Sequence, residues 1–344
     1  MSRPRSRPLT AWSMARVPAL LLTATLVLAA CGGEGPQATD GSGATAREGA
    51  IEYPLTLDNC GHEVTFDAPP ERVALLHSAP VASLEALGVL DQVVVRAGAF
   101  PDAYLGDEGQ QIIDEVPSLA DDIDPDGHFE LSEEAVIAEV PDLVLGDADG
   151  VSRESLADAG IPQLIVPSQC PGAEDSPDDE DVYELNEIYG EVFDLPAAAE
   201  QYNDDLRGRW QAIVEQTRDE DRTAAVLFPT VGVGPGWAYG TISMAHPQLE
   251  AAGFENVFAD VDERVFEVSY EELIARDPDV LVLLHVDGEP EPVEDTVRSL
   301  PGAEGMAAVA NDDILVHLFN FTEPPTPLTI DGLEHIVDTF GSAP

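Results

Sequence analysis

The residues best suited to hold a ligand follow apolar runs that are typical of β-strands. In parallel α/β sheets, ligands bind beyond the carboxyl ends of the strands. The candidates at or just past these ends are His77, Ser78, Arg96, Phe100, Tyr104, Asp147, Trp237, Tyr239, His285 and Phe319. The aromatic rings suit the apolar wall of a site for a bulky organic molecule. A single histidine is more often an ordinary hydrogen-bonded side chain than a metal ligand.

The sequence offers no catalytic motif. It has no G-x-S-x-G elbow, no H-E-x-x-H and no cysteine–histidine pair at motif spacing. Carboxylates are so abundant that a pair of them carries no information. The Gly-rich stretch from Val231 to Gly240 lacks the lysine of a phosphate loop and is predicted to be a loop that presents Trp237 and Tyr239. We therefore expect a binding protein with no catalytic residues, no metal site and no resident cofactor.

The charge balance restricts the partners. The chain has 15 basic and 67 acidic residues, a net charge of −52, and every basic residue is arginine. Such a surface repels nucleic acid and anionic membranes, since nothing in it could neutralise phosphates. The simplest interpretation is a solvated, self-repelling surface, typical of a salty habitat or of high solubility.

The N-terminus indicates export. Residues 1–30 have a basic start and an apolar core from Val17 to Ala30, the pattern of a signal peptide that is too short to span a membrane. The segment Leu28–Cys31 looks like the lipobox of bacterial lipoproteins, which predicts a lipid on Cys31. Residues 31–50 are rich in Gly, Ser and Ala and are predicted to be a flexible tether. The expected location is outside the cytoplasmic membrane, anchored by lipid, on the cell surface or the periplasmic side.

The other two cysteines are Cys60 and Cys170. An exported protein meets an oxidising compartment, so we predict that they form a disulfide that attaches an N-terminal hairpin to the first lobe. Two buried free thiols are the alternative.

Strand and helix patterns alternate along most of the chain, which predicts parallel α/β units. The expected organisation is an N-terminal α/β lobe at 51–180, a helical region at 181–221 with a long helix between the lobes, and a C-terminal α/β lobe at 222–344. Each lobe is expected to be Rossmann-like, with a ligand cleft between them. Trp210 is predicted to pack in a core. The stretch from His246 to Phe258 is predicted to be one helix.

A repeat supports two similar lobes. The stretch Leu131–Leu145 matches Val268–Val282 when Pro141 is aligned with Pro278. Identical pairs are Ser132/Ser269, Glu134/Glu271, Ile137/Ile274, Ala138/Ala275 and Asp142/Asp279. The helix "LEALG" likewise recurs as "LEAAG".

These motifs, with "PPERVALL" and "LADAGIPQLIV", resemble the substrate-binding lipoproteins of ABC importers for iron–siderophore complexes and cobalamin, the class III periplasmic-binding family. The resemblance implies two α/β lobes, one rigid inter-lobe helix and a monomer that delivers its ligand to a permease dimer. It also implies that Glu134 and Glu271 dock on the permease. Two positions depart from the family pattern: Ala82 replaces a frequent glutamate and Val95 replaces a glycine. The family's ligand contacts are therefore not transferred to this chain.

The small number of arginines restricts the charge that the ligand can carry. Only Arg96, Arg153 and Arg264 lie on loops that are predicted to face the cleft. A tris-catecholate anion would need a cluster of guanidinium groups. We therefore expect a neutral or cationic iron(III)–hydroxamate complex. The alternatives are cobalamin, haem held by His77, His285 or a tyrosine, and a tethered sensor or adhesion module with no transport role.

Overall fold

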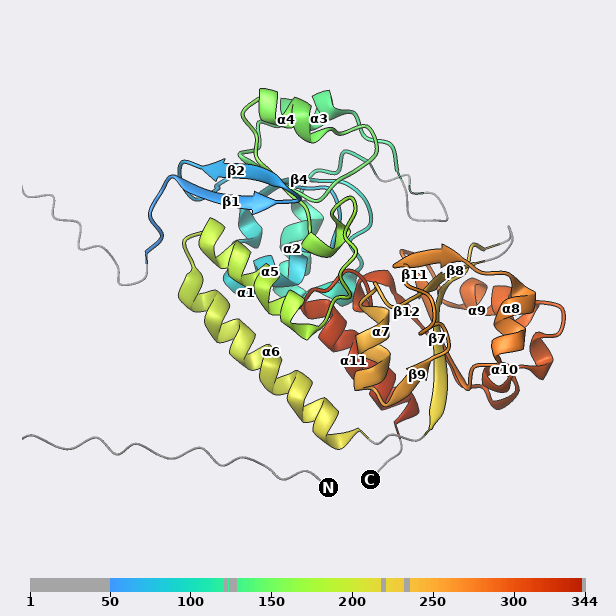
Figure 1. Cartoon of the computed structure of the whole chain (residues 1–344). Helices are drawn as coiled ribbons and strands as arrows, with labels where there is room; N and C mark the ends of the chain where they lie inside the picture. Colours follow the sequence, from blue (N-terminus) through green and yellow to red (C-terminus); the bar gives the residue numbers. More distant parts are fainter. Residues whose placement is uncertain (1–49, 121–122, 124–128, 218–220, 232–235, 342–344) are drawn as a thin grey trace, which may run out of the picture. The chain divides into compact units, whose positions relative to one another are not determined.

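The structure is a computed structural model that describes residues 50–120, 123, 129–217, 221–231 and 236–341. Figure 1 shows the fold. The N-terminal lobe contains a parallel sheet in the order β4-β3-β5-β6. The strands are β3 (Val73–Leu75), β4 (Val93–Arg96), β5 (Leu143–Leu145) and β6 (Gln163–Leu164). Strands β3 and β5 are buried at every residue. This is the pattern expected of strands that are covered on both faces.

Short helices alternate with the strands of this lobe. They are α1 (Val81–Leu87), α2 (Asp107–Glu115), α3 (Glu133–Ala138) and α4 (Arg153–Asp158). Three 3-10 turns, η1 (Leu90–Gln92), η2 (Asp102–Tyr104) and η3 (Pro167–Gln169), lie between elements. Helix α1 ends at Gly88, whose φ of 70° lies in the left-handed region that favours glycine.

A hairpin precedes the lobe, as predicted. Strands β1 (Leu55–Asn59) and β2 (His62–Phe66) are antiparallel and joined by Cys60 and Gly61. Both turn residues have positive φ, 58° and 75°, which is the conformation of a two-residue type I′ turn. Cys60 is bonded to Cys170, with an S–S distance of 2.06 Å. The predicted pairing is therefore confirmed, and it attaches the hairpin turn to the segment after η3.

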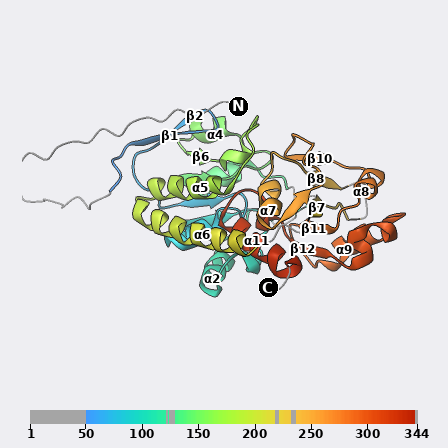
Figure 2. The same cartoon turned by 60° about the horizontal axis from the view of Figure 1, so that its bottom comes forward.

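Two long helices follow, α5 (Asp179–Val192) and α6 (Pro196–Gln216), and they pack side by side (Figure 2). Helix α6 is the predicted long helix. Its 21 residues correspond to about 32 Å at 1.5 Å per residue. Ala199 near its start belongs to the core of the first lobe, whereas Leu206 and Trp210 belong to the core of the second. A single helix is thus packed into both cores, and Trp210 is a packing residue as predicted.

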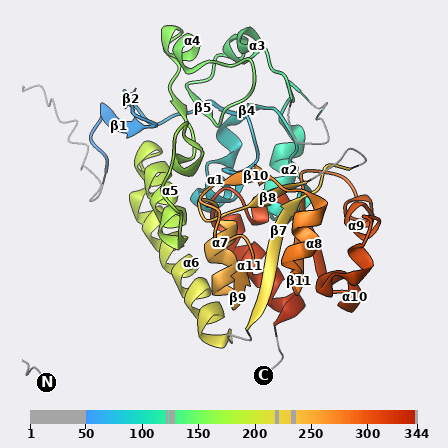
Figure 3. The ribbon, with the colours of Figure 1, turned by 45° about the vertical axis from the view of Figure 1, so that its right-hand side comes forward.

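The C-terminal lobe has a mixed sheet in the order β10-β8-β7-β11-β12, with β9 also paired to β7. Figure 3 labels all of these strands except β12. The strands are β7 (Arg222–Phe228), β8 (Trp237–Tyr239), β9 (Phe254–Asn256), β10 (Val265–Glu267), β11 (Val280–His285) and β12 (Ile314–Leu318). The helices and turns are α7 (Ala245–Ala251), α8 (Tyr270–Arg276), α9 (Glu291–Arg298), η4 (Ala303–Gly305), α10 (Ala307–Asn311), η5 (Phe319–Phe321) and α11 (Pro327–Phe340). The lobe combines a parallel centre with an antiparallel edge.

Two sequence predictions were wrong in this lobe. Residues 254–256 form strand β9 rather than the end of a helix, because Gly253, with φ of 84°, ends the helical run. Trp237 and Tyr239 lie on strand β8 rather than on a loop, because the segment pairs with β7 and β10. Tertiary pairing decided the state of a stretch whose glycines favoured a turn.

The repeated stretch folds in the same way in both lobes. Ser132 and Ser269 are the N-caps of α3 and α8, and each hydroxyl accepts a backbone N–H three residues on. Val140 and Asp277, each just before the aligned proline, both adopt positive φ, 52° and 47°. Strands β5 and β11 follow. The prediction of two lobes with a shared architecture is confirmed.

Candidate functional site

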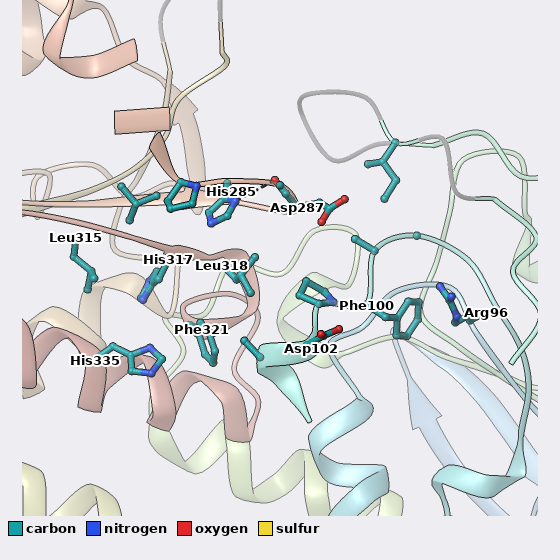
Figure 4. A pocket seen from close by; sticks show the side chains of 18 residues that line it. Arg96, Phe100, Asp102, His285, Asp287, Leu315, His317, Leu318, Phe321 and His335 are labelled. Atoms are coloured by element: carbon teal, nitrogen blue, oxygen red, sulfur yellow. Dashed lines mark hydrogen bonds between the residues drawn. The ribbon is translucent and has the colours of Figure 1, made fainter. Parts of the chain in front are cut away.

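A cavity of about 760 Å³ lies where β4 of the first lobe faces β11 and β12 of the second. Arg96, Phe100 and Asp102 line it from the first lobe, and His285, His317 and His335 line it from the second (Figure 4). Strands β4, β11 and β12 all end here, as expected for a ligand site in α/β sheets. The volume is within the usual range for sites that bind small organic molecules.

Among the described residues that line the cavity, Arg96 is the one guanidinium on the first-lobe wall. Arg96 lies over the ring of Phe100, with 5.2 Å between its Cζ atom and the ring centroid, and its Nε donates to the carbonyl of Ile113. The carboxylates of Asp102 and Asp287 face the same cavity from opposite lobes, and both side chains are exposed. The charged side chains that line the cavity therefore carry net negative charge, which disfavours a highly anionic ligand.

The second-lobe wall is made of imidazoles around Phe321. The ring centroids of His335 and Phe321 are 4.7 Å apart, edge to face, and those of His317 and Phe321 are 5.8 Å apart. His317 is 5 % exposed, and its burial lowers its pKa to about 3. His317 is therefore neutral at physiological pH.

Buried hydrogen bonds of Ser78, Asn320 and Tyr104 join the two lobes beside the cavity. The Ser78 hydroxyl donates to Asn320 Oδ1 at 2.9 Å, and the Asn320 backbone N–H donates to the Tyr104 hydroxyl at 2.9 Å. Tyr104 also packs edge to face on Phe321, with centroids 5.2 Å apart, and burial raises its pKa. Ser78 and Tyr104 thus connect the lobes and do not line the cavity.

His77 and Asp147 lie at the ends of β3 and β5, also outside the lining of the cavity. His77 packs so closely on Gly146 that a Cβ there would lie 2.4 Å from the imidazole ring. Burial lowers the pKa of His77, while the exposed carboxylate of Asp147 opposes this shift. The backbone N–H of Ala79 donates to His77 Nδ1 at 3.3 Å. The Nε2 atom of His77 has no partner among the described residues.

The aromatic candidates of the second lobe lie apart from the cavity lining. Trp237 is 40 % exposed on β8. Tyr239 is buried in the core, and burial raises its pKa. Phe319 is half-buried and packs edge to face on Phe228, with centroids 6.1 Å apart. Their assignment to ligand binding stays a prediction.

Two of the arginines expected at the cleft are held by other groups. Arg153 donates to Asn59 Oδ1 and to the carbonyl of Gln163, each at 2.8 Å. Arg264 forms a 3.3 Å ion pair with Glu323, whose carboxylate is 1 % exposed. Burial raises the pKa of Glu323, although Arg264 opposes the shift. Arg96 alone of these three arginines lines the cavity.

Sequence reasoning missed several lining residues, namely Asp102, Asp287, His317 and His335. Asp287 follows β11 closely, so the strand-end rule could have found it. His317 lies inside β12, and His335 lies in the middle of helix α11. No local pattern marks those two positions, because only the packing of α11 beside β12 brings them together.

Glu134 and Glu271 are exposed in the first turns of α3 and α8. Glu134 accepts a hydrogen bond from Ser132 at 2.7 Å, which lowers its pKa. Cys31 lies outside the described residues. Within the described part of the chain, no three His, Cys, Asp or Glu side chains are arranged to hold a metal ion. None of the helices in those residues is long and apolar enough to cross a membrane.

Comparisons with known proteins agree with this architecture. Residues 73–317 match the family described as periplasmic binding protein. A crystal structure from Saccharomonospora viridis, described as an ABC-type Fe3+-hydroxamate transport system, is 56% identical, with a TM-score of 0.82. The match covers 85% of this chain and 100% of that chain. Comparison with curated protein sequences gives no match.

More distant structures share the fold alone. A periplasmic binding protein from Veillonella parvula has 18% identity and a TM-score of 0.69, and the match covers 83% of this chain and 97% of that one. A periplasmic heme binding protein from Pseudomonas aeruginosa has 20% identity and a TM-score of 0.64, with 80% and 94% covered.

Proposed function

Because the chain belongs to the periplasmic binding protein family, whose members are substrate-binding proteins of transporters, we propose that it captures an iron(III)–hydroxamate complex and delivers it to an ABC permease. The observation that carries this proposal is the 56% identity to the Fe3+-hydroxamate transport protein, over that protein's whole length. Relatives at or below 20% identity add only the fold and do not choose the ligand.

The chemistry of the cavity supports a neutral or cationic chelate. Arg96 shares the cavity with two carboxylates, Asp102 and Asp287, and His317 in the same lining is uncharged. A trianionic tris-catecholate would place its charge beside these carboxylates with one guanidinium to offset it. A ferric tris-hydroxamate has no net charge on its metal centre and avoids this cost.

A ligand panel tests the proposal. Mature protein is titrated in a calorimeter with ferric desferrioxamine B, a ferric tris-catecholate, cobalamin and ferric protoporphyrin. We expect saturable binding of the hydroxamate, at least about ten-fold tighter than the catecholate, a difference of about 1.4 kcal/mol. Tighter binding of the catecholate, cobalamin or protoporphyrin would refute the proposal.

We also propose that residues 1–30 are removed as a signal peptide, that Cys31 carries lipid and that 31–50 tether the lobes at 51–180 and 222–344 to the membrane. The segment Leu28–Cys31 supports the lipid anchor. Changing Cys31→Ala should move the protein from the membrane fraction to the soluble fraction outside the cytoplasmic membrane. Retention of the variant on the membrane would contradict lipid anchoring.

Glu134 and Glu271 are proposed as the docking points for the permease. Both are exposed, and they occupy equivalent positions in α3 and α8, one in each lobe. Two carboxylates in equivalent places suit a partner with two-fold symmetry. Glu134→Arg and Glu271→Arg should leave ligand affinity unchanged but abolish uptake. Glu154→Arg and Glu291→Arg, at exposed first-turn positions of α4 and α9, are the matched controls. Normal uptake by the Glu134/Glu271 double variant would contradict docking.

A further inference from the structure

His317 is the end of a buried chain of hydrogen bonds. Gln248 Nε2 donates to the carbonyls of Phe321 and Thr329, each at 2.7 Å. Carbonyl oxygens only accept, so the orientation of this amide is determined and its Oε1 is an acceptor. The Thr322 hydroxyl lies 3.0 Å from that Oε1 and 3.0 Å from His317 Nε2.

Counting protons along this chain assigns the tautomer of His317. Thr322 has one hydroxyl proton, and it donates that proton to Gln248 Oε1. Its oxygen must therefore accept from His317, so His317 Nε2 carries the ring proton. The other nitrogen, Nδ1, is left with a lone pair. Nδ1 is buried and has no partner among the described residues. A buried polar atom without a partner calls for an explanation.

His285 also keeps a lone pair on one ring nitrogen, but its nitrogens have exchanged roles and the free one is not among the buried unpartnered atoms of the described residues. Its Nδ1 lies 3.1 Å from the carbonyl oxygen of Asp287, which can only accept. Nδ1 is therefore the protonated nitrogen, and Nε2 keeps the lone pair. No hydrogen bond to this Nε2 occurs within the described residues. Both imidazoles line the second-lobe wall of the cavity (Figure 4).

We propose that His317 Nδ1 and His285 Nε2 accept hydrogen bonds from N–H or ammonium groups on the organic arms of the bound chelate. This assignment rests on the proposed function and extends it, since the cleft then selects hydroxamates that present donors. A ferric tris-hydroxamate already has six oxygen ligands, so an imidazole cannot reach its metal. The donors available to the histidines are those of the ligand arms.

The surrounding groups favour the same kind of ligand. The carboxylates of Asp102 and Asp287 also accept hydrogen bonds, and Arg96 supplies the charged donor on the opposite wall. Nδ1 of His317 is shielded from water, and the exposed ring of His335 lies beside it, with centroids 6.2 Å apart. The proposal therefore includes a movement of the exposed His335 side chain that lets a ligand donor reach Nδ1.

Nitrogen NMR tests the assignment directly. Protein labelled with ¹⁵N-histidine is recorded alone and with gallium(III) desferrioxamine B, a diamagnetic complex with amide N–H groups and a terminal ammonium. In the free protein, His317 should be protonated at Nε2 and His285 at Nδ1. Adding the complex should move the resonance of the unprotonated nitrogen in each ring. A proton on the opposite nitrogen, or binding without movement of these resonances, would overturn the assignment and leave the proposed function standing.

Variants give a second measurement. His317→Phe and His285→Phe remove one acceptor each and should weaken binding of ferric desferrioxamine B by roughly three- to ten-fold. Thr322→Val, which removes the partner of Nε2, should weaken binding as well, whereas Thr322→Ser keeps the hydroxyl and should not. Unchanged affinity in both Phe variants would refute the acceptor role. Failure of the wild-type protein to bind the complex would overturn the proposed function and this inference together.

Discussion

The repeated stretch has the same backbone path in both lobes, but different contacts stabilise it in each lobe. In both copies a serine caps the helix and a left-handed residue precedes a proline. An aspartate after the proline accepts backbone N–H groups from the first strand region of its lobe. Asp142 binds the N–H groups of Glu71 and Arg72, and Asp279 binds that of Thr223. The residues that the copies share are those that set the path of the chain.

The copies differ at the left-handed residue. Asp277 accepts the backbone N–H of Ala307 at 2.7 Å and so fixes the start of α10. Val140 has a β-branched side chain that is 68% exposed, although β-branched residues seldom adopt positive φ. Arg72 instead binds the carbonyls of Val140 and Glu139 at the end of α3. The comparison shows that one backbone conformation can be maintained by two unrelated sets of contacts.

Another difference is the Cys60–Cys170 disulfide. Among the described residues, only the first lobe has such a bond. Changing Cys60→Ala together with Cys170→Ala should lower the free energy of unfolding by about 4–5 kcal/mol, because the bridge closes a loop of 110 residues. The loss should be concentrated in the first lobe, as measured by hydrogen exchange of β3 against β11. An unchanged unfolding midpoint after reduction would show that the disulfide does not distinguish the lobes.

The two aspartates should differ in importance. Asp279 is half-buried and binds both the N–H and the hydroxyl of Thr223, so Asp279→Ala should cost about 2 kcal/mol. Asp142 is exposed, so Asp142→Ala should cost about 1 kcal/mol. Urea denaturation of both variants measures the ranking. Asparagine at either position keeps one acceptor and serves as the control; equal losses would contradict the effect of burial.

Acid should weaken the second lobe through His317. Burial lowers the pKa of His317 to about 3 in the folded state, whereas the unfolded imidazole titrates near 6.5. This group therefore stabilises the fold fully above pH 6.5, and the contribution is lost as the pH falls toward 3. Between pH 7 and pH 5 the loss should reach up to about 2 kcal/mol. Denaturant titrations at both pH values should show a smaller loss in His317→Phe, and an identical loss would contradict this account.

The smallest effect should come from replacing the left-handed residue by glycine. The change in stability should have opposite signs in the two lobes. Val140→Gly should raise stability by about 0.5–1 kcal/mol because glycine removes the strain. Asp277→Gly should lower it by about 0.5 kcal/mol because the bond to Ala307 is lost. Melting temperatures of both variants measure the signs. Ala138→Gly, near the end of α3, controls for added backbone entropy; destabilisation by Val140→Gly would show that its conformation is not strained.

Much of the fold could be predicted from local patterns. Ser132 and Ser269 mark helix starts, Gly88 ends α1, and the apolar runs of β5 and β11 lie beside Pro141 and Pro278. The segment 237–239 could not be predicted, because its strand state depends on pairing with β7 and β10 rather than on its own residues. Of the residues predicted from the strand ends, Arg96, Phe100 and His285 line the cavity, whereas Ser78 and Tyr104 contact Asn320 and do not line it.

The sequence by itself determined the two-lobed α/β fold, the acidic character and the cysteine pair. The first two follow from local periodicity, helix caps, an internal repeat and composition, and the pair follows from export and from the presence of two cysteines besides Cys31. Only the tertiary structure decided which side chains share the cavity. His317 and His335 come together because α11 packs beside β12, and the tautomer of His317 depends on Gln248, which is far away in the chain. Hydrogen-bond networks of this kind join residues from separate elements, so no local pattern records them.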